Sequence, residues 1–170
     1  NDTLMLTLDM GHFHPTETIA DKIPSLLLFS PDLLVHVSRG VRWDSDFVVI
    51  TEDPLVEAMK EIARIPVVDK RDGFERVRLA TDFFDGSINR IAAWTIGVRA
   101  TRKAVLSALL EPADLLRSME ADRNYAGRLA LMDELRTAPA GAVWDQYCVS
   151  RGVPVGNRYM DEIARYEREV

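Results

Sequence analysis

The sequence predicts an α/β protein built from parallel β/α units, and two observations favour this fold class. Short apolar runs recur along the first two thirds of the chain, and segments with helical periodicity separate them. Polar residues follow these runs directly, which is where parallel folds place their functional groups, at the carboxyl ends of the strands. From residue 112 onward the pattern is helical throughout.

Three apolar runs are predicted to form strands, at residues 4–8, 33–37 and 77–81. The first run alternates too little for a half-exposed strand, so we expect it to be buried on both faces. A loop is expected at residues 38–40, followed by a short apolar run at 47–50.

The helices between the strands have recognisable start signals. Thr16 is expected to cap a helix that continues towards residue 29, with a kink or break at Pro24. A second helix is expected to have Asp53 at its N-cap and Pro54 as its first residue.

The helix over residues 88–110 should be capped by Ser87 and buried in its first half, since apolar side chains nearly surround it. Beyond it, the sequence predicts helices that start at Pro112 and Asn124, one at 140–150, and a last amphipathic helix after a loop at 152–156.

Placement of the candidate ligands fits a (β/α)8 barrel, of which the strands at residues 1–111 would make only half, and a helical extension follows at 112–170. An open doubly wound sheet would normally carry a glycine-rich phosphate loop, whereas Gly11 stands alone. The chain has no initiator Met and starts at a strand, so we expect it to be the later part of a longer protein.

Composition limits the partners. The net charge is −6 and there is no basic block, which argues against a nucleic-acid partner. Cys148 is the single cysteine, which excludes an internal disulfide and suggests a reducing compartment. No apolar run approaches a membrane span and no signal peptide is visible, so we expect a soluble cytoplasmic protein.

Side chains that can bind a metal ion gather after the predicted strands. One imidazole with two or three carboxylates is a donor set for a divalent ion such as Mn²⁺, Mg²⁺ or Co²⁺ rather than for a thiolate zinc site. Two carboxylates that are separated by one residue project to the same side of an extended backbone. The candidates are Asp9, His12, His36, Asp44, Asp46 and Asp82.

Each candidate also has an ordinary structural interpretation. The pair Asp44 and Asp46 would serve as solvated capping residues in a loop, and His36 as a hydrogen-bonded core histidine. Asp82 would be a carboxylate near a helix N-terminus. The convergence of histidines and carboxylates on strand ends favours a metal site.

Several long motifs resemble the L-rhamnose isomerase family, in order and over nearly the whole chain. They lie at residues 8–17, 36–39, 41–46, 82–85, 87–94, 108–112, 141–145 and 152–156. The resemblance implies a (β/α)8 barrel, a homotetramer and a metal-dependent aldose–ketose isomerase that converts L-rhamnose to L-rhamnulose. It covers only the C-terminal part of a family member, which implies that residues 1–111 are the C-terminal half of the barrel and that the extension at 112–170 forms an oligomer interface.

The resemblance also implies the ligands. His12, Asp44 and Asp46 match the ligands of a catalytic ion, typically Mn²⁺, whereas Asp9, His36 and Asp82 match those of a second ion, Zn²⁺ or Mn²⁺. The family's second site also takes a glutamate from an earlier strand, which this chain does not contain. Two groups are candidates for the proton transfer. One is a water molecule that the ion activates, and the other is Asp82, the candidate catalytic residue.

The chain departs from the family pattern at three positions. Phe47 stands where the family has histidine, and we expect this loss of a polar group next to Asp46 to change sugar preference. Gly40 replaces a proline and Pro24 a serine, while His14 has no assigned role. The alternatives are a related sugar isomerase or epimerase for another aldose, or a non-catalytic fragment whose late helices form an interface.

Overall fold

The computed structural model describes residues 4–67 and 70–170, and its centre is a parallel three-stranded sheet. The strands are β1 (Leu6–Asp9), β2 (Leu33–Val37) and β5 (Val77–Thr81), in the order β1-β2-β5. With eight helices among the described residues, they form the α/β fold that the sequence predicts. Three strands do not close a barrel, so the half-barrel and the division at residue 111 stay predictions.

β1 is less buried than expected. Leu8 is the one fully buried residue of the strand, whereas Leu4, Met5 and Leu6 are exposed. The expectation of burial on both faces is therefore wrong for this strand in the structure. The reason is its position: β1 pairs with β2 along one side only and forms an edge of the sheet.

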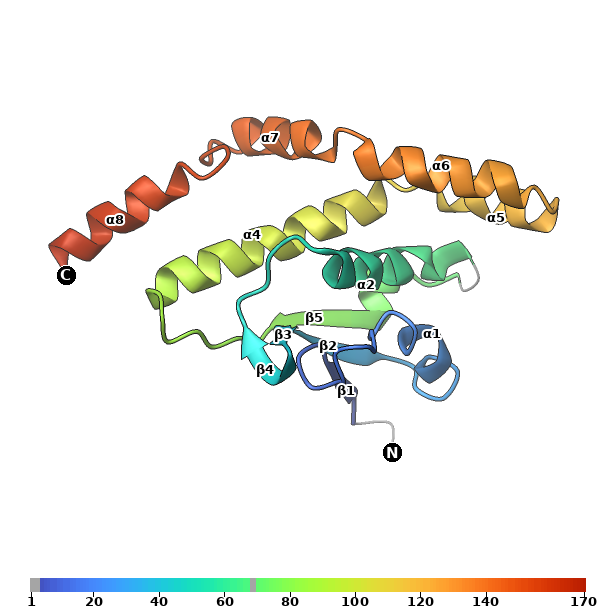
Figure 1. Cartoon of the computed structure of the whole chain (residues 1–170), viewed down its shortest axis with the longest axis horizontal. Coiled ribbons are helices and arrows are strands. Elements are labelled where there is room, and N and C mark those ends of the chain that lie inside the picture. The colour runs from blue at the N-terminus through green and yellow to red at the C-terminus, as the bar shows by residue number, and fades with distance from the viewer. Residues whose placement is uncertain (1–3, 68–69) are drawn as a thin grey trace.

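The core lies between the sheet and one helix layer. Leu33, Val35 and Val37 of β2 are fully buried, whereas the alternate residues of this strand are half-buried. The buried residues pack with Leu55 and Met59 of α2 (Asp53–Arg64). α2 and α4 (Arg90–Leu109) pack together on this side of the sheet (Figure 1).

The predicted loop at residues 38–40 is wrong in part: Ser38 lies between two strands, but Arg39 and Gly40 belong to a hairpin. β3 (Arg39–Val41) pairs antiparallel with β4 (Trp43–Phe47), and Arg42 turns between them with a φ of 71°. Asp44 and Asp46 therefore lie on a strand rather than in a loop. Their spacing then places both side chains on one side of that strand.

The helix expected from Thr16 to residue 29 is also wrong in extent. Only α1 (Ile23–Leu26) forms there, with Pro24 in its first turn. Proline has no N–H to donate to the carbonyl four residues earlier, so a continuous helix cannot pass through this position. Turns precede it instead.

α2 confirms the expected helix but begins one residue earlier, with Glu52 at the N-cap and Asp53 in the first turn. α4 confirms the next helix with two corrections. Its N-cap is Asn89, whose side chain accepts hydrogen bonds from two backbone N–H groups, and not Ser87. Its first half is not buried all round, because Trp94 is 52% exposed.

The late helices follow the prediction closely and lie in Figure 1 beyond α4 from the sheet. They are α5 (Ala113–Ala121), α6 (Tyr125–Thr137), α7 (Ala140–Ser150) and α8 (Tyr159–Glu169). Arg99 of α4 contacts both α7 and α8. Its guanidinium lies over the rings of Trp144 in α7 and Tyr159 in α8, and its Nη2 donates to the carbonyl of Pro154 at 3.0 Å. The elements η1 (Ile65–Val67) and α3 (Gly73–Arg76) connect α2 to β5.

Arg76 fixes the turn that leads into β2. Its buried guanidinium donates to the carbonyls of Pro31 at 2.9 Å, Leu27 at 3.2 Å and Ser30 at 3.3 Å. Arg76→Met should lower the free energy of unfolding by about 2–4 kcal/mol, because these carbonyls lose a charged donor. Urea denaturation measures this, and Arg168→Met, at an exposed position of α8, should stay within about 0.5 kcal/mol of the parent.

Candidate metal centre

Strand register brings three predicted ligands together at the carboxyl edge of the sheet. Asp9 is the last residue of β1 and lies opposite His36 on β2. Asp82 directly follows β5, and its N–H donates to the carbonyl of Val37 at 3.2 Å. His36 Nδ1 consequently lies 3.2 Å from Asp9 Oδ2 and 3.1 Å from Asp82 Oδ2.

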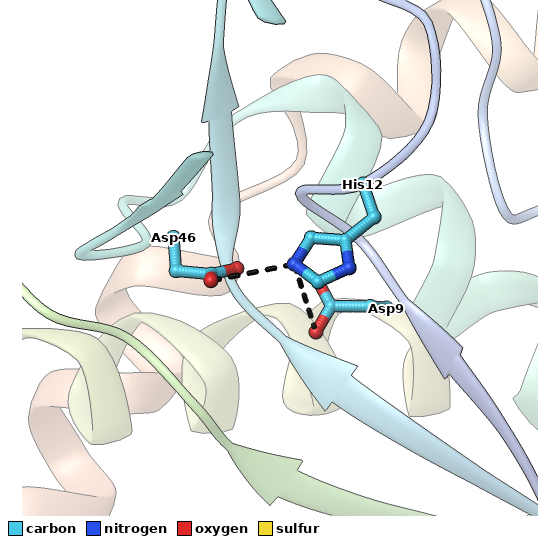
Figure 2. Close-up of side chains that lie close together, drawn as sticks. All are labelled: Asp9, His12 and Asp46. Atoms are coloured by element: carbon cyan, nitrogen blue, oxygen red, sulfur yellow. Dashed lines mark hydrogen bonds and ion pairs between the residues drawn. The ribbon is translucent and has the colours of Figure 1, made fainter. Parts of the chain in front are cut away.

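His12 lies between Asp9 and the hairpin. Figure 2 shows its Nε2 facing the carboxylates of Asp9 and Asp46, at 3.8 Å and 3.4 Å. Asp44 Oδ1 is 3.6 Å from the same nitrogen, although two thirds of the Asp44 side chain is exposed. The loop after β1 and the strand β4, which are far apart in sequence, therefore meet at this imidazole.

Among the described residues, two groups of side chains have ligand atoms close enough to share an ion. Within each group these atoms lie within 4.8 Å of one another: Asp9, His12 and Asp46 form the first, and Asp9, His36 and Asp82 the second. The second has the composition that the resemblance implies. The first contains Asp9 in the place of Asp44, which is 3.6 Å from His12 but belongs to neither group, so the ligand role of Asp44 stays a prediction.

The two oxygens of Asp9 have different surroundings. Oδ1 accepts hydrogen bonds from the Ser38 hydroxyl at 2.8 Å and from the Gly11 N–H at 2.9 Å. Oδ2 faces both histidines. Asp9 thus belongs to both groups through one atom.

Gly11 allows the loop after β1 to approach the hairpin. A Cβ at this position would lie 2.1 Å from the carbonyl oxygen of Ser45 and 2.9 Å from Asp46 Oδ1. The Ser45 N–H also donates to the Gly11 carbonyl at 3.2 Å. Only glycine fits this close contact between two backbones.

The donor set suits a divalent cation. Asp46 Oδ1 is buried and has no hydrogen-bond partner among the described residues, although a buried carboxylate oxygen is normally paired. A cation would satisfy this oxygen. Imidazole nitrogens and carboxylate oxygens together match the preferences of Mn²⁺ and similar ions. The residues present therefore fit the group that the resemblance implies.

The carboxylates stabilise the protonated form of His12. Its pKa is raised above the usual 6.5, chiefly by the hydrogen bond to Asp46. Desolvation lowers the pKa, and the charges of Asp9, Asp46 and Asp44 raise it further. A proton and a metal ion compete for this nitrogen, so ion binding should weaken as the pH falls through that raised pKa.

Asp46→Asn should lower the pKa of His12, because it removes the charge of the partner with the largest effect. Histidine ring resonances, followed by NMR across pH in the presence of a chelator, measure this shift. An unchanged pKa in the variant would contradict the assignment of Asp46 as the main partner of His12.

The remaining candidates lie at the edge of this centre. His14 Nδ1 is 2.7 Å from the Thr16 hydroxyl, so this imidazole contacts its own loop. Phe47 is the last residue of β4, and alternation along the strand directs its side chain away from the face that carries Asp46. The expected effect of Phe47 on sugar preference stays a prediction.

Sequence reasoning missed two residues that shape the site. From the sequence, Ser38 is expected only as part of a loop. Gly11 is considered only as an isolated glycine that does not form a phosphate-binding motif. The signal for Gly11 is its place between two predicted ligands, where a close backbone approach is needed. The signal for Ser38 is its position two residues after His36, directly past the end of β2, where polar side chains of a parallel sheet gather.

A parallel sheet with imidazoles and carboxylates at its carboxyl edge defines an α/β protein with a candidate divalent-metal centre. None of the described helices is long and apolar enough to cross a membrane. The chain belongs to the L-rhamnose isomerase (RhaA) family, whose model matches residues 1–170.

Curated relatives agree with this membership. An L-rhamnose isomerase of Rhodopirellula baltica is 52% identical over 166 residues, which is 98% of this chain. L-rhamnose isomerases of Salmonella paratyphi B and Salmonella newport are each 50% identical over 165 residues, or 97% of the chain. The chain spans 38% of the length of each of these relatives.

Proposed function

We propose that the complete protein containing this chain is a metal-dependent aldose–ketose isomerase that converts L-rhamnose to L-rhamnulose. The observation that carries the proposal is the pair of three-residue groups at the carboxyl edge of the sheet. Membership of the L-rhamnose isomerase family supports the reaction and the sugar.

The proposed ligands of the catalytic ion are His12, Asp44 and Asp46, with Mn²⁺ as the ion. Asp9 and His36, together with Asp82, would hold a second ion, Zn²⁺ or Mn²⁺. A bound divalent ion would polarise the C1 and C2 oxygens of the open-chain sugar and stabilise the negative charge that develops on them. The proximity of the donor atoms supports His12 and Asp46 for the first ion and all three residues for the second, whereas the assignment of Asp44 rests on the resemblance.

The reaction moves one hydrogen from C2 to C1, while the hydroxyl proton leaves O2 and a proton is added at O1. Asp82 is the proposed residue for moving the hydroxyl proton, because its carboxylate is more than half exposed and so open to a sugar. His36 Nδ1 lies 3.1 Å from Asp82 Oδ2 and would orient that carboxylate.

We further propose that the complete protein is a cytoplasmic homotetramer, with small sugars and not nucleic acids or membranes as partners. Exposed apolar side chains on the last helices support an interface there. They include Val143 and Val149 of α7 and Met160 and Tyr166 of α8, and Val153 in the loop between these helices is exposed as well.

The test is turnover by the purified complete protein, with metal content measured in parallel. With Mn²⁺ it should form L-rhamnulose from L-rhamnose, and a chelator should abolish the activity. A panel of aldoses in the same assay identifies the preferred sugar. A faster reaction with another aldose would favour a related isomerase, and protein without a stoichiometric ion would favour the non-catalytic alternative.

The 170-residue chain alone should form no ketose, because it supplies three strands and, by the resemblance, lacks a glutamate ligand of the second ion. The same assay, applied to the purified chain and the complete protein at equal concentration, measures this. Turnover by the chain alone would show that these residues suffice for a working centre.

A further inference from the structure

We propose that Ser38 is a positioning residue, which holds Asp9 so that one carboxylate oxygen serves both groups of the metal centre. This inference deepens the proposed function and rests on its metal centre. Ser38 touches neither histidine in the described contacts and acts through Asp9.

The first step is the restraint on Asp9. Ser38 is 1% exposed and directly follows β2, so the backbone fixes its position next to β1. Its hydroxyl and the Gly11 N–H donate to the same oxygen, Asp9 Oδ1, at 2.8 Å and 2.9 Å. Two donors on one oxygen define the rotation of the carboxylate, since a hydrogen bond to a charged acceptor is stronger than a neutral one.

The second step is the consequence for the other oxygen. With Oδ1 held, Asp9 Oδ2 points to His36 Nδ1 at 3.2 Å and to His12 Nε2 at 3.8 Å. If the Ser38 hydroxyl were absent, the carboxylate would lose one of the two donors that distinguish its oxygens. Ion binding in both groups should then weaken together, because both use Oδ2.

A purely structural role makes a different prediction. Loss of a buried hydroxyl would then lower stability and leave metal affinity unchanged. Thr101 provides a matched control, because it is also buried and its hydroxyl donates to the Gly97 carbonyl at 2.8 Å, within α4 and away from the centre.

The experiment compares Ser38→Ala and Thr101→Val in the complete protein. Mn²⁺ affinity is measured from the electron paramagnetic resonance signal of free Mn²⁺, and thermal unfolding is followed by circular dichroism. Ser38→Ala should weaken Mn²⁺ binding by about 10–100-fold, which is typical for the partner of a metal ligand. Thr101→Val should lower the unfolding temperature and leave the affinity unchanged.

A double variant tests that Ser38 acts through Asp9. On the Asp9→Asn background, Ser38→Ala should change the remaining affinity by less than about twofold, because the group it positions is already altered. Full additivity, or an affinity in Ser38→Ala equal to that of the parent, would overturn the proposal.

Turnover of the parent separates this inference from the proposed function. A parent that binds Mn²⁺ but converts no L-rhamnose refutes the function and leaves the affinity comparison valid. A parent that converts L-rhamnose, with no loss of affinity in Ser38→Ala, refutes the positioning role alone. A parent that binds no ion refutes both.

Discussion

Asp46→Asn in the complete protein should lower the rate of L-rhamnulose formation by at least about 100-fold, since even residues that only support a metal ligand typically contribute 10–100-fold. Asp46 Oδ2 lies 3.4 Å from His12 Nε2, and its buried Oδ1 has no hydrogen-bond partner among residues 4–67 and 70–170. Asparagine keeps the shape and removes the charge that a divalent ion requires. Turnover and metal content of the purified variant are the measurements.

The companion variant, Asp44→Asn, tests the less buried carboxylate of the same strand, and we expect a comparable loss if Asp44 is a ligand. Asp53→Asn is the matched control, because it removes an exposed carboxylate that pairs with Arg136 and belongs to neither ligand group. This control should keep its activity. Full turnover by both Asp44→Asn and Asp46→Asn would refute the isomerase proposal.

Gly11→Ala should have the second large effect. The new Cβ would lie 2.1 Å from the Ser45 carbonyl oxygen, and backbone cannot yield as a side-chain tip can. The hairpin must therefore shift away from the loop after β1, which separates Asp46 from His12. We expect a loss of about 1–3 kcal/mol in the free energy of unfolding and a clear loss of Mn²⁺ affinity.

Gly141→Ala is the matched control. Gly141 lies in the first turn of α7, and its added Cβ would meet no described atom within 4 Å beyond its chain neighbours and the backbone of its own helix. Alanine should stabilise this helix by about 0.5–1 kcal/mol. Chemical denaturation measures both variants, and a Gly11→Ala protein as stable and as tightly metal-bound as the parent would contradict the close contact that the structure describes.

Local patterns in the sequence were enough to predict most of the fold. The strands β2 and β5 and the late helices carry their own signals, such as Asn124, whose side chain caps α6. The failures depend on tertiary context. Burial of β1 depends on which elements flank it, and the β3–β4 hairpin depends on contacts such as that between Ser45 and Gly11.

The candidate site was predictable in its residue types and less so in its arrangement. The fold class predicts that Asp9 and His36 lie at the same edge of the sheet, and the register of the structure places them opposite each other. The approach of Asp46 to His12 requires the hairpin, which the sequence pattern did not reveal. The contacts of Ser38 and Gly11 with Asp9 are hydrogen bonds across the sheet edge, which the positions of these residues in the sequence indicate only indirectly.

The shared oxygen of Asp9 would couple the binding of one ion to the binding of the other. An ion that draws Oδ2 towards His36 draws it away from His12, so the occupancies of the two groups are not independent. Thermodynamic linkage requires that each ion change the affinity of the other by the same factor. Titration with Mn²⁺ should therefore give a curve that deviates from two independent, additive steps.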